Sequence, residues 1–263
     1  MNRLKLSIVY YLNSLPLAWG FVHGRQRDIF ELDFSSPSRC ADLLADGSVD
    51  IGLIPSIEYQ RIRGVRVISG LSIASKRQVQ SVLLISKVPA ERIQTVAIDN
   101  SSRTSIVLLR ILLALKYRTQ PTMRSCEPEL DAMLNHSDAA LIIGDTALKA
   151  GIDDLYRYDL AEEWRVLTGK PFVFAFWGVR SGVNLADPSV FQQSLAYGET
   201  HLDEIVQQQS QTLHLPVDQL HRYLTENINY TLDQENLEGL QLFYELAADT
   251  LGMETTRAVE FVG

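Results

Sequence analysis

The sequence predicts an α/β fold whose two lobes face each other across a cleft. Strand-like and helix-like segments alternate through the first third of the chain, and a second alternation begins near Lys87. The chain has 263 residues, of which 46% are hydrophobic and 21% charged, so it can bury the cores of two small lobes. The alternating order favours a largely parallel sheet with helices on its faces.

The first third begins with the run LKLSIV (4–9), in which Leu and Ile alternate as in a strand with one buried face. A helix over 36–47 is predicted from Ser36 as its N-cap, Pro37 in its first turn and Gly47 at its end. The other predicted elements of this third are strands at 29–34, 49–54, 65–69 and 81–86, and a short helix that begins at Pro55.

The second unit is predicted from a strand at 95–98 and the long helix that follows the polar turn at 99–105. A buried strand at 139–143 and a helix after Gly144 come next. Residues 169–180 are predicted to form a strand that leads back out of the second unit, and the chain from Asp187 onward is predicted to be helical. We therefore predict crossovers near 86–90 and 170–180. Lobe 1 would comprise residues 1–88 and 176–263, and lobe 2 residues 89–175. Ligands bind at the carboxyl ends of strands in such sheets, so the cleft is expected there, and a hinge could close it.

Composition excludes several classes of partner. The formal net charge is −8 and no basic stripe occurs, so nucleic acid is not expected to bind. No stretch approaches the roughly 18 apolar residues of a membrane span. The first apolar run is broken by Ser7 and lacks a small-residue cleavage site, so we expect no signal peptide and a cytoplasmic protein. Cys40 and Cys126 are too few for a disulfide framework or a metal cluster, and we expect free, partly buried thiols.

Three polar junctions join a predicted strand to a predicted helix: NSLP (13–16), IPSIE (54–58) and DNSSRTS (99–105). Each combines free backbone N–H groups, the positive end of a helix dipole and hydroxyl groups, which together suit a carboxylate or phosphate. A single Ser there is usually only a cap, and Asn13 or Ser14 is well suited to cap its helix. Three such junctions at equivalent positions favour an anion-binding cleft. Arg103 could contact the ligand or form a surface ion pair, and its sequence context favours the ion pair.

The common signatures of nucleophiles, nucleotide sites and metal sites are absent: GxSxG, the P-loop, GxGxxG and HExxH do not occur. The five histidines are not paired at metal-binding spacing and are expected to be solvated. Asp145 follows a buried strand, where a functional acid could lie, although a helix N-cap role fits it as well.

Six segments, in this order, resemble the successive signatures of the chorismate dehydratase family: YLNSLPLAWG, VDIGLIPSIEY, QSVLLISKVP, SSRTSIVLLRILL, LIIGDTAL and TGKPFVFAFW. No single segment is decisive, but the ordered set is specific and extends over essentially the whole chain. The resemblance implies a two-lobed, type II periplasmic-binding-protein-like fold. It also implies loss of water from chorismate to give 3-[(1-carboxyvinyl)oxy]benzoate in the futalosine route to menaquinone, with no metal or organic cofactor.

Two alternatives remain open at this point. The sister enzyme that makes 1,4-dihydroxy-6-naphthoate shares the implied fold, but it typically has SPCPNDTF near its start and a catalytic histidine in an HE pair. Here the corresponding places are YYLNSLPL and GDTA (144–147), so that histidine is missing. A solute-binding protein for an anionic aromatic ligand is the other alternative, and the expected absence of an export signal counts against it.

The resemblance also implies which residues face the substrate. Asn13 and Ser81 are expected to be the functional pair, and Phe174 and Trp177 are equally consistent with walls around the ring and with the core. Lys170 departs from the apolar residue that relatives often have, and its role is open beyond a possible charge at the rim. The substrate-facing set implied by the family is Asn13, Ser56, Ser81, Ser102, Thr104, Ser105, Gly144 and Asp145.

The implied reaction removes a ring hydrogen beside the enolpyruvyl ether of chorismate together with the neighbouring hydroxyl, and the ring becomes aromatic. No histidine lies in the matched segments, so the proton acceptor is either Asp145 or a carboxylate of the substrate. No sequence feature indicates an oligomeric state.

Overall fold

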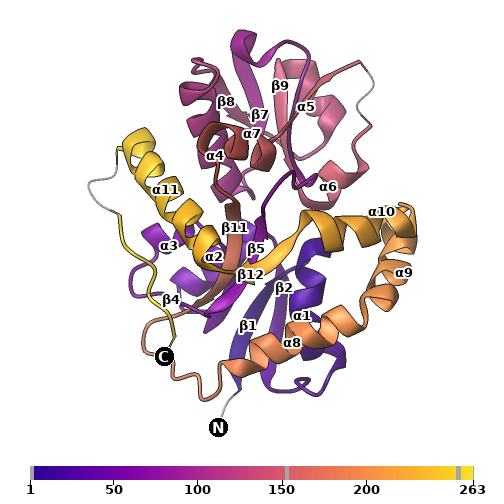
Figure 1. Cartoon of the computed structure of the whole chain (residues 1–263), viewed down its shortest axis with the longest axis vertical. Helices are drawn as coiled ribbons and strands as arrows, with labels where there is room; N and C mark the ends of the chain where they lie inside the picture. Colours follow the sequence, from indigo (N-terminus) through magenta and orange to yellow (C-terminus); the bar gives the residue numbers. More distant parts are fainter. Residues whose placement is uncertain (1–2, 152–153, 253–255, 263) are drawn as a thin grey trace.

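The computed structural model describes residues 3–151, 154–252 and 256–262, and it has two lobes, each built on its own sheet (Figure 1). In the described residues the larger sheet has seven strands in the order β12-β5-β11-β3-β1-β2, with β4 paired to β11. The smaller sheet has five strands in the order β10-β6-β9-β7-β8. The predicted two-lobed α/β class is confirmed.

The larger sheet contains β1 (Leu4–Val9), β2 (Phe30–Ser35), β3 (Ile51–Pro55), β4 (Arg66–Val67), β5 (Gly70–Ser75), β11 (Phe172–Val179) and β12 (Asn229–Leu232). The smaller sheet contains β6 (Val82–Ser86), β7 (Thr95–Ile98), β8 (Thr122–Ser125), β9 (Ala139–Ile143) and β10 (Tyr156–Asp159).

The helices cover these sheets and carry the chain between them. The α-helices are α1 (Leu15–His23), α2 (Pro37–Ala45), α3 (Glu58–Arg61), α4 (Arg103–Leu115), α5 (Leu130–His136), α6 (Gly144–Lys149), α7 (Leu160–Thr168), α8 (Ser189–Thr200), α9 (Leu202–Leu213), α10 (Val217–Arg222) and α11 (Gln234–Leu251). Two short 3₁₀ segments, η1 (Leu12–Ser14) and η2 (Ala90–Arg92), and a π-helical turn, η3 (Tyr223–Asn227), complete the described elements. None of the described helices combines the length and the hydropathy needed to cross a membrane.

The sheets are mixed rather than largely parallel, which corrects the prediction. Parallel pairing joins β1 to β2 and β3, and β7 to β8 and β9. However, β11 runs antiparallel to β3 and β5, and β6 runs antiparallel to β9 and β10. Strands β6 and β11 account for the antiparallel pairs. Each is the first strand after the chain crosses between the lobes, so each enters its sheet from the other lobe rather than through a helical crossover.

The crossings between the sheets lie earlier in the chain than the predicted boundaries. Strand β6, placed in lobe 1 by the prediction, belongs to the smaller sheet, and all of β11 belongs to the larger sheet. The chain therefore passes from the larger sheet to the smaller one between residues 75 and 82, and it returns between residues 159 and 172. The sequence places these boundaries poorly because both strands are continuous apolar runs that would suit either core.

Four strands and one helix have no counterpart in the prediction: β5, β8, β10, β12 and α7. Strands β8, β10 and β12 are at sheet edges. Their sequences, TMRS, YRYD and NYTL, are largely polar, as edge strands often are. An apolar pattern therefore cannot reveal them. The short helix predicted to begin at Pro55 instead begins at Glu58, because Pro55 still belongs to β3.

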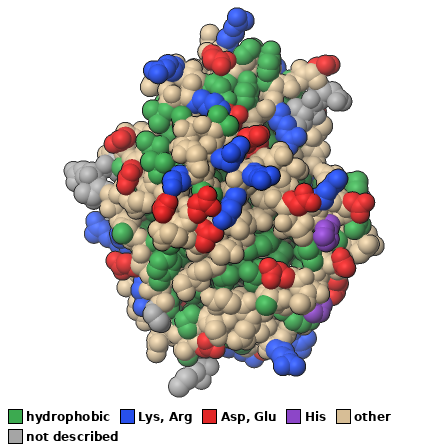
Figure 2. Space-filling model, in the orientation of Figure 1, with side chains coloured by type: hydrophobic (Ala, Val, Ile, Leu, Met, Phe, Trp, Pro, Cys, Tyr) green, Lys and Arg blue, Asp and Glu red, His purple; other side chains and the backbone are tan. Residues whose placement is uncertain are grey.

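Helix α11 connects the two lobes on one side of the molecule (Figure 1). It packs against β11 of the larger sheet and against α4 of the smaller lobe. On the face shown in Figure 2, basic and acidic side chains are interspersed. Both cysteines are free, as expected, but Cys40 is fully buried and Cys126 is exposed, so neither is the partly buried thiol that was predicted.

Candidate active site

A cavity lies between the lobes, and residues from both of them line it. Val9 and Pro55, at the carboxyl ends of β1 and β3, line it from the larger lobe. Ile143, the last residue of β9, and the turn after β7 line it from the smaller lobe. The ligand cavity is therefore at the carboxyl ends of the strands, as the sequence predicted.

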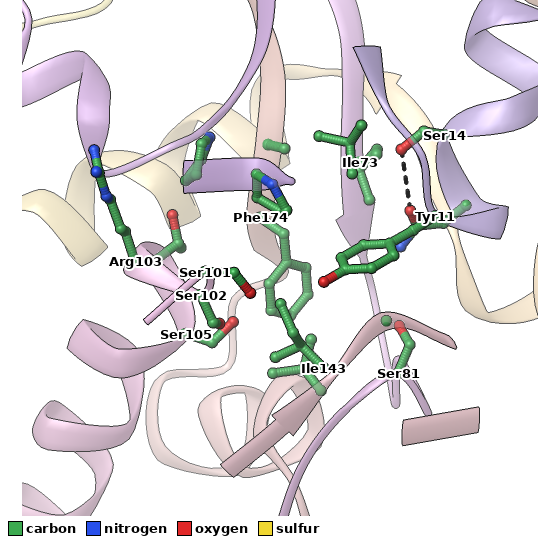
Figure 3. A pocket seen from close by; sticks show the side chains of 18 of the residues that line it. Tyr11, Ser14, Ile73, Ser81, Ser101, Ser102, Arg103, Ser105, Ile143 and Phe174 are labelled. Carbon is green, nitrogen blue, oxygen red and sulfur yellow. Dashed lines mark hydrogen bonds between the residues drawn. The ribbon is translucent and has the colours of Figure 1, made fainter. Parts of the chain in front are cut away.

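Seven of the ten sequence-predicted site residues line this cavity: Asn13, Ser81, Ser102, Thr104, Ser105, Gly144 and Phe174. Figure 3 shows Tyr11, Ser14 and Ser81 on one side and Ser101, Ser102, Arg103 and Ser105 on the other, with Phe174 and Ile143 between them. Two polar walls thus face each other across an apolar middle.

The first polar wall is organised by the short segment η1, which follows β1. Asn13 donates a hydrogen bond from Nδ2 to the Tyr223 hydroxyl (3.1 Å), and its Oδ1 accepts one from Ser14 Oγ (3.3 Å). Neither Asn13 nor Ser14 caps α1 with its side chain, so the predicted capping role is wrong. The Asn13 amide is committed to this wall rather than to the helix.

Ser81, the residue just before β6, completes the first wall. Its Oγ accepts a hydrogen bond from the Tyr223 hydroxyl (2.8 Å), and its carbonyl accepts one from the Gly144 N–H (2.8 Å). Tyr223 therefore joins Asn13 of the larger lobe to Ser81 of the smaller one.

The second polar wall is the amino end of α4. The first N–H groups of a helix lack intrahelical partners, and the helix dipole favours an anion beside them. Ser102 precedes this helix, and its buried hydroxyl has no hydrogen-bond partner in the described structure. Ser105 also lines the cavity from the first turn of α4. Because buried hydroxyls normally have partners, the Ser102 hydroxyl is available to bond a group in the cavity.

Thr104 lines the same wall, but its hydroxyl is already engaged with the other lobe. It accepts a hydrogen bond from the Ile57 N–H (3.2 Å) and lies 3.5 Å from Ser56 Oγ. Ser56 Oγ in turn donates to the carbonyl of Val173 (2.8 Å). Ser56 is fully buried and outside the cavity lining, so it serves the contact between the lobes rather than facing the cavity.

Arg103 forms the ion pairs that its sequence context favoured. Its guanidinium contacts Glu58 (3.0 Å) and Asp42 (2.7 Å), both carried by helices of the larger lobe. The side chain of Glu58 is only 5% exposed. Arg103 therefore connects the two lobes and also lines the cavity. Lys170 pairs instead with Glu238 (2.6 Å), away from the cavity lining.

The apolar middle of the cavity contains Phe174 but not Trp177. Trp177 is fully buried in the larger lobe and packs edge-on against Phe21 and Phe191. The two aromatic residues are three apart on β11, so they point to opposite faces of the strand. Only Phe174 faces the cavity.

Tyr11 was missed by the sequence analysis and covers part of the first wall. A Cβ atom on Gly144 would lie 2.8 Å from the Tyr11 ring, and Gly144 has φ +59°. Glycine is therefore required at this position for both backbone conformation and space. Tyr11 has no motif that singles it out, because a Tyr at a strand end usually packs in the core.

Asp145 lies beside the cavity but outside its lining. Its carboxylate accepts a hydrogen bond from the Leu12 N–H (3.1 Å), which holds η1 against α6. Burial raises the pKa of Asp145, and the hydrogen bond from Leu12 opposes that rise.

These features define the class of fold to which the protein belongs. Two lobes on separate sheets with an anion-suited cavity between them form a periplasmic-binding-protein-like scaffold. A protein from Archaeoglobus fulgidus (AF1704) shares it with a TM-score of 0.77 at 15% identity, covering 95% of this chain and 98% of that one. A Candida albicans gene product (CA3427), described as having the generic periplasmic binding protein fold, matches with a TM-score of 0.58 at 13% identity over 100% and 99% of the two chains. At these identities the likeness shows the fold alone.

The sequence comparisons then identify the family. A family model described as menaquinone biosynthesis matches residues 4–249. The chain therefore belongs to the menaquinone biosynthesis family. The chorismate dehydratase of Thermus thermophilus is 27% identical over 267 aligned residues, which cover 93% of this chain and 95% of the relative.

Proposed function

We propose that this protein is a hydro-lyase that removes water from chorismate to give 3-[(1-carboxyvinyl)oxy]benzoate. The observation that carries the proposal is the pair of facing polar walls in the cavity of a chain that belongs to this family. Chorismate is a dianion with a cyclohexadiene ring. A cavity with hydrogen-bond donors at both ends and Phe174 between them suits such a molecule.

One substrate carboxylate is seated at the amino end of α4. The Ser102 and Ser105 hydroxyls and the free N–H groups of the first helical turn supply its donors. Hydrogen bonds to a charged group contribute about 1.5–3 kcal/mol each. They therefore offset the long-range repulsion of an acidic protein for an anion.

The chemistry takes place beside Asn13 and Ser81. The hydrogen leaves the ring carbon that bears the enolpyruvyl ether, and its C–H electron pair forms a new ring double bond. The C–O bond on the neighbouring carbon breaks, and the hydroxyl departs with the proton as water. Because the product ring is aromatic, the reaction is strongly downhill, and the protein's task is to hold the reacting groups in a productive geometry.

A carboxylate of the substrate is the favoured proton acceptor. Asp145 lies outside the cavity lining and already accepts the Leu12 N–H, so its carboxylate supports η1 rather than meeting the ring. Asn13 and Ser81 then orient the substrate so that its carboxylate reaches the ring hydrogen.

The direct test is incubation of the purified, chelator-treated protein with chorismate, followed by chromatography for the benzoate product. We expect conversion at an undiminished rate after chelation. Protein that leaves chorismate untouched but converts a futalosine-derived substrate would move the assignment to the sister enzyme. Protein that binds an aromatic anion without converting it would be a solute-binding protein.

A further inference from the structure

Tyr223 contacts both residues to which the proposed chemistry is assigned, although it does not line the cavity itself. Its hydroxyl donates to Ser81 Oγ (2.8 Å) and accepts from Asn13 Nδ2 (3.1 Å). The Tyr223 side chain is 1% exposed. It is thus a buried link between two cavity-lining residues from different lobes.

The single hydrogen of the Tyr223 hydroxyl decides how the linked groups present themselves to the cavity. Because that hydrogen goes to Ser81, Tyr223 can only accept from Asn13. Ser81 Oγ accepts from Tyr223, so its own hydrogen is left to point elsewhere. Within the described residues no other hydrogen bond uses the Ser81 hydroxyl as a donor, and Ser81 lines the cavity. The second Asn13 Nδ2 hydrogen is similarly left over.

A second tyrosine from the same segment fixes the backbone of Asn13. The Tyr230 hydroxyl donates to the Asn13 carbonyl (3.0 Å) from β12. Tyr223 begins the π-helical turn η3, just before β12. Such turns are uncommon and frequently occur at functional sites. This C-terminal segment therefore holds both the side chain and the main chain of Asn13.

We propose that Tyr223 is a positioning residue, which orients the Asn13 amide and the Ser81 hydroxyl as hydrogen-bond donors toward substrate oxygen atoms. The identity of those atoms, a carboxylate or the departing hydroxyl, rests on the proposed function. If Ser81 instead donated its hydrogen to Tyr223, the Ser81 oxygen would present only lone pairs to the dianionic substrate. Burial also raises the pKa of the Tyr223 hydroxyl well above its usual value, so the hydroxyl stays protonated and remains a donor.

The test compares Tyr223→Phe with Tyr59→Phe in the full-length protein. Tyr59 is a matched control, because it is also buried and its hydroxyl both donates, to the Ala258 carbonyl (2.9 Å), and accepts, from the Glu260 N–H (2.8 Å). It lies outside the cavity lining. Both variants should lose similar thermal stability. Only Tyr223→Phe should lower kcat for chorismate, by about ten- to a hundredfold, with KM changed by less than about threefold.

A double variant shows whether Tyr223 acts through Ser81. We expect Tyr223→Phe to lower kcat by a smaller factor in the Ser81→Ala background than in the wild-type protein, because one of the two donors that Tyr223 orients is already gone. Multiplicative losses would overturn the proposal, as would an unchanged kcat in Tyr223→Phe.

A measurement without substrate separates this inference from the proposed function. In ¹⁵N-labelled protein, the side-chain amide resonances of Asn13 should shift in Tyr223→Phe and stay in place in Tyr59→Phe. Wild-type protein that does not convert chorismate refutes the proposed function, and the amide resonances still decide the positioning of Asn13. Resonances that stay in place in Tyr223→Phe refute the positioning role.

Discussion

Replacing Asn13 by Asp tests the proposed chemistry most sharply, because it changes charge and hydrogen bonding with almost no change in shape. In the wild-type protein the Asn13 amide donates to Tyr223, and Tyr223 donates to Ser81. A carboxylate cannot donate. The Tyr223 hydrogen would turn to the carboxylate, the Ser81 hydroxyl would turn to Tyr223, and the cavity would lose both donors of its first wall.

The expected magnitude follows from the added charge. Two unit charges about 4 Å apart at an effective dielectric near 20 repel by roughly 4 kcal/mol. Each 1.36 kcal/mol is about tenfold in rate, so the repulsion corresponds to nearly a thousandfold. Asn13 is only partly buried, and solvent screens some of this repulsion. We therefore expect kcat/KM to fall by about two to three orders of magnitude.

Folding should be nearly unaffected, because the carboxylate still accepts from Ser14 and gains the hydrogen of Tyr223. The assay is chorismate turnover beside a thermal melt, with a Tm within about 4 °C of wild type. Asn184→Asp adds the same charge on an exposed loop and should leave both measurements unchanged. Near wild-type turnover in Asn13→Asp would refute both the placement of the substrate and the role of the amide.

The further predictions concern single substitutions at four positions. Ser105→Ala should raise KM about tenfold with little loss of stability. Thr104→Val should instead lower the free energy of unfolding by about 1–3 kcal/mol, because it removes a hydrogen bond between the lobes. Steady-state kinetics and urea unfolding distinguish the two variants, and the opposite pattern would contradict the geometry. Asp145→Asn should keep kcat within about threefold, and a loss of more than about a hundredfold would make Asp145 the base. Burial raises the folded-state pKa of Asp145 above its unfolded value of about 3.9, so its ionised form opposes folding. The Asp145→Asn variant should therefore be more stable than the wild-type protein once the pH has risen through the pKa of Asp145 in the folded state. This difference in stability should vanish below the pKa of Asp145 in the unfolded state, and a difference that is constant with pH would contradict the prediction. Gly144→Ala should cost about 2–4 kcal/mol, because it strains a positive φ and presses a methyl group onto the Tyr11 ring; an unchanged melting temperature would count against that crowding.

Local pattern accounts for the elements that the sequence predicted well. The strand at residues 4–9 and the helix with Ser36 and Pro37 at its start depend on alternation and capping, which act over a few residues. The hydroxyl cluster before α4 could be found in the same way. Edge strands such as β8 could not be found, because their stability comes from pairing with distant residues rather than from their own composition.

Sequence alone predicted a polar cleft at Asn13 and at the amino end of α4, from the type and local position of those residues, and the family resemblance added Ser81. Only the tertiary structure decided which hydroxyls remain open: Ser102 has no partner among the residues that the structure describes, while Ser56 and Thr104 bond across the lobes. It also brought Tyr223 to Asn13 across 210 positions of the chain and to Ser81 across 142. No local pattern encodes such a contact, since burial and the single hydrogen of a hydroxyl act only once the distant segments have packed together.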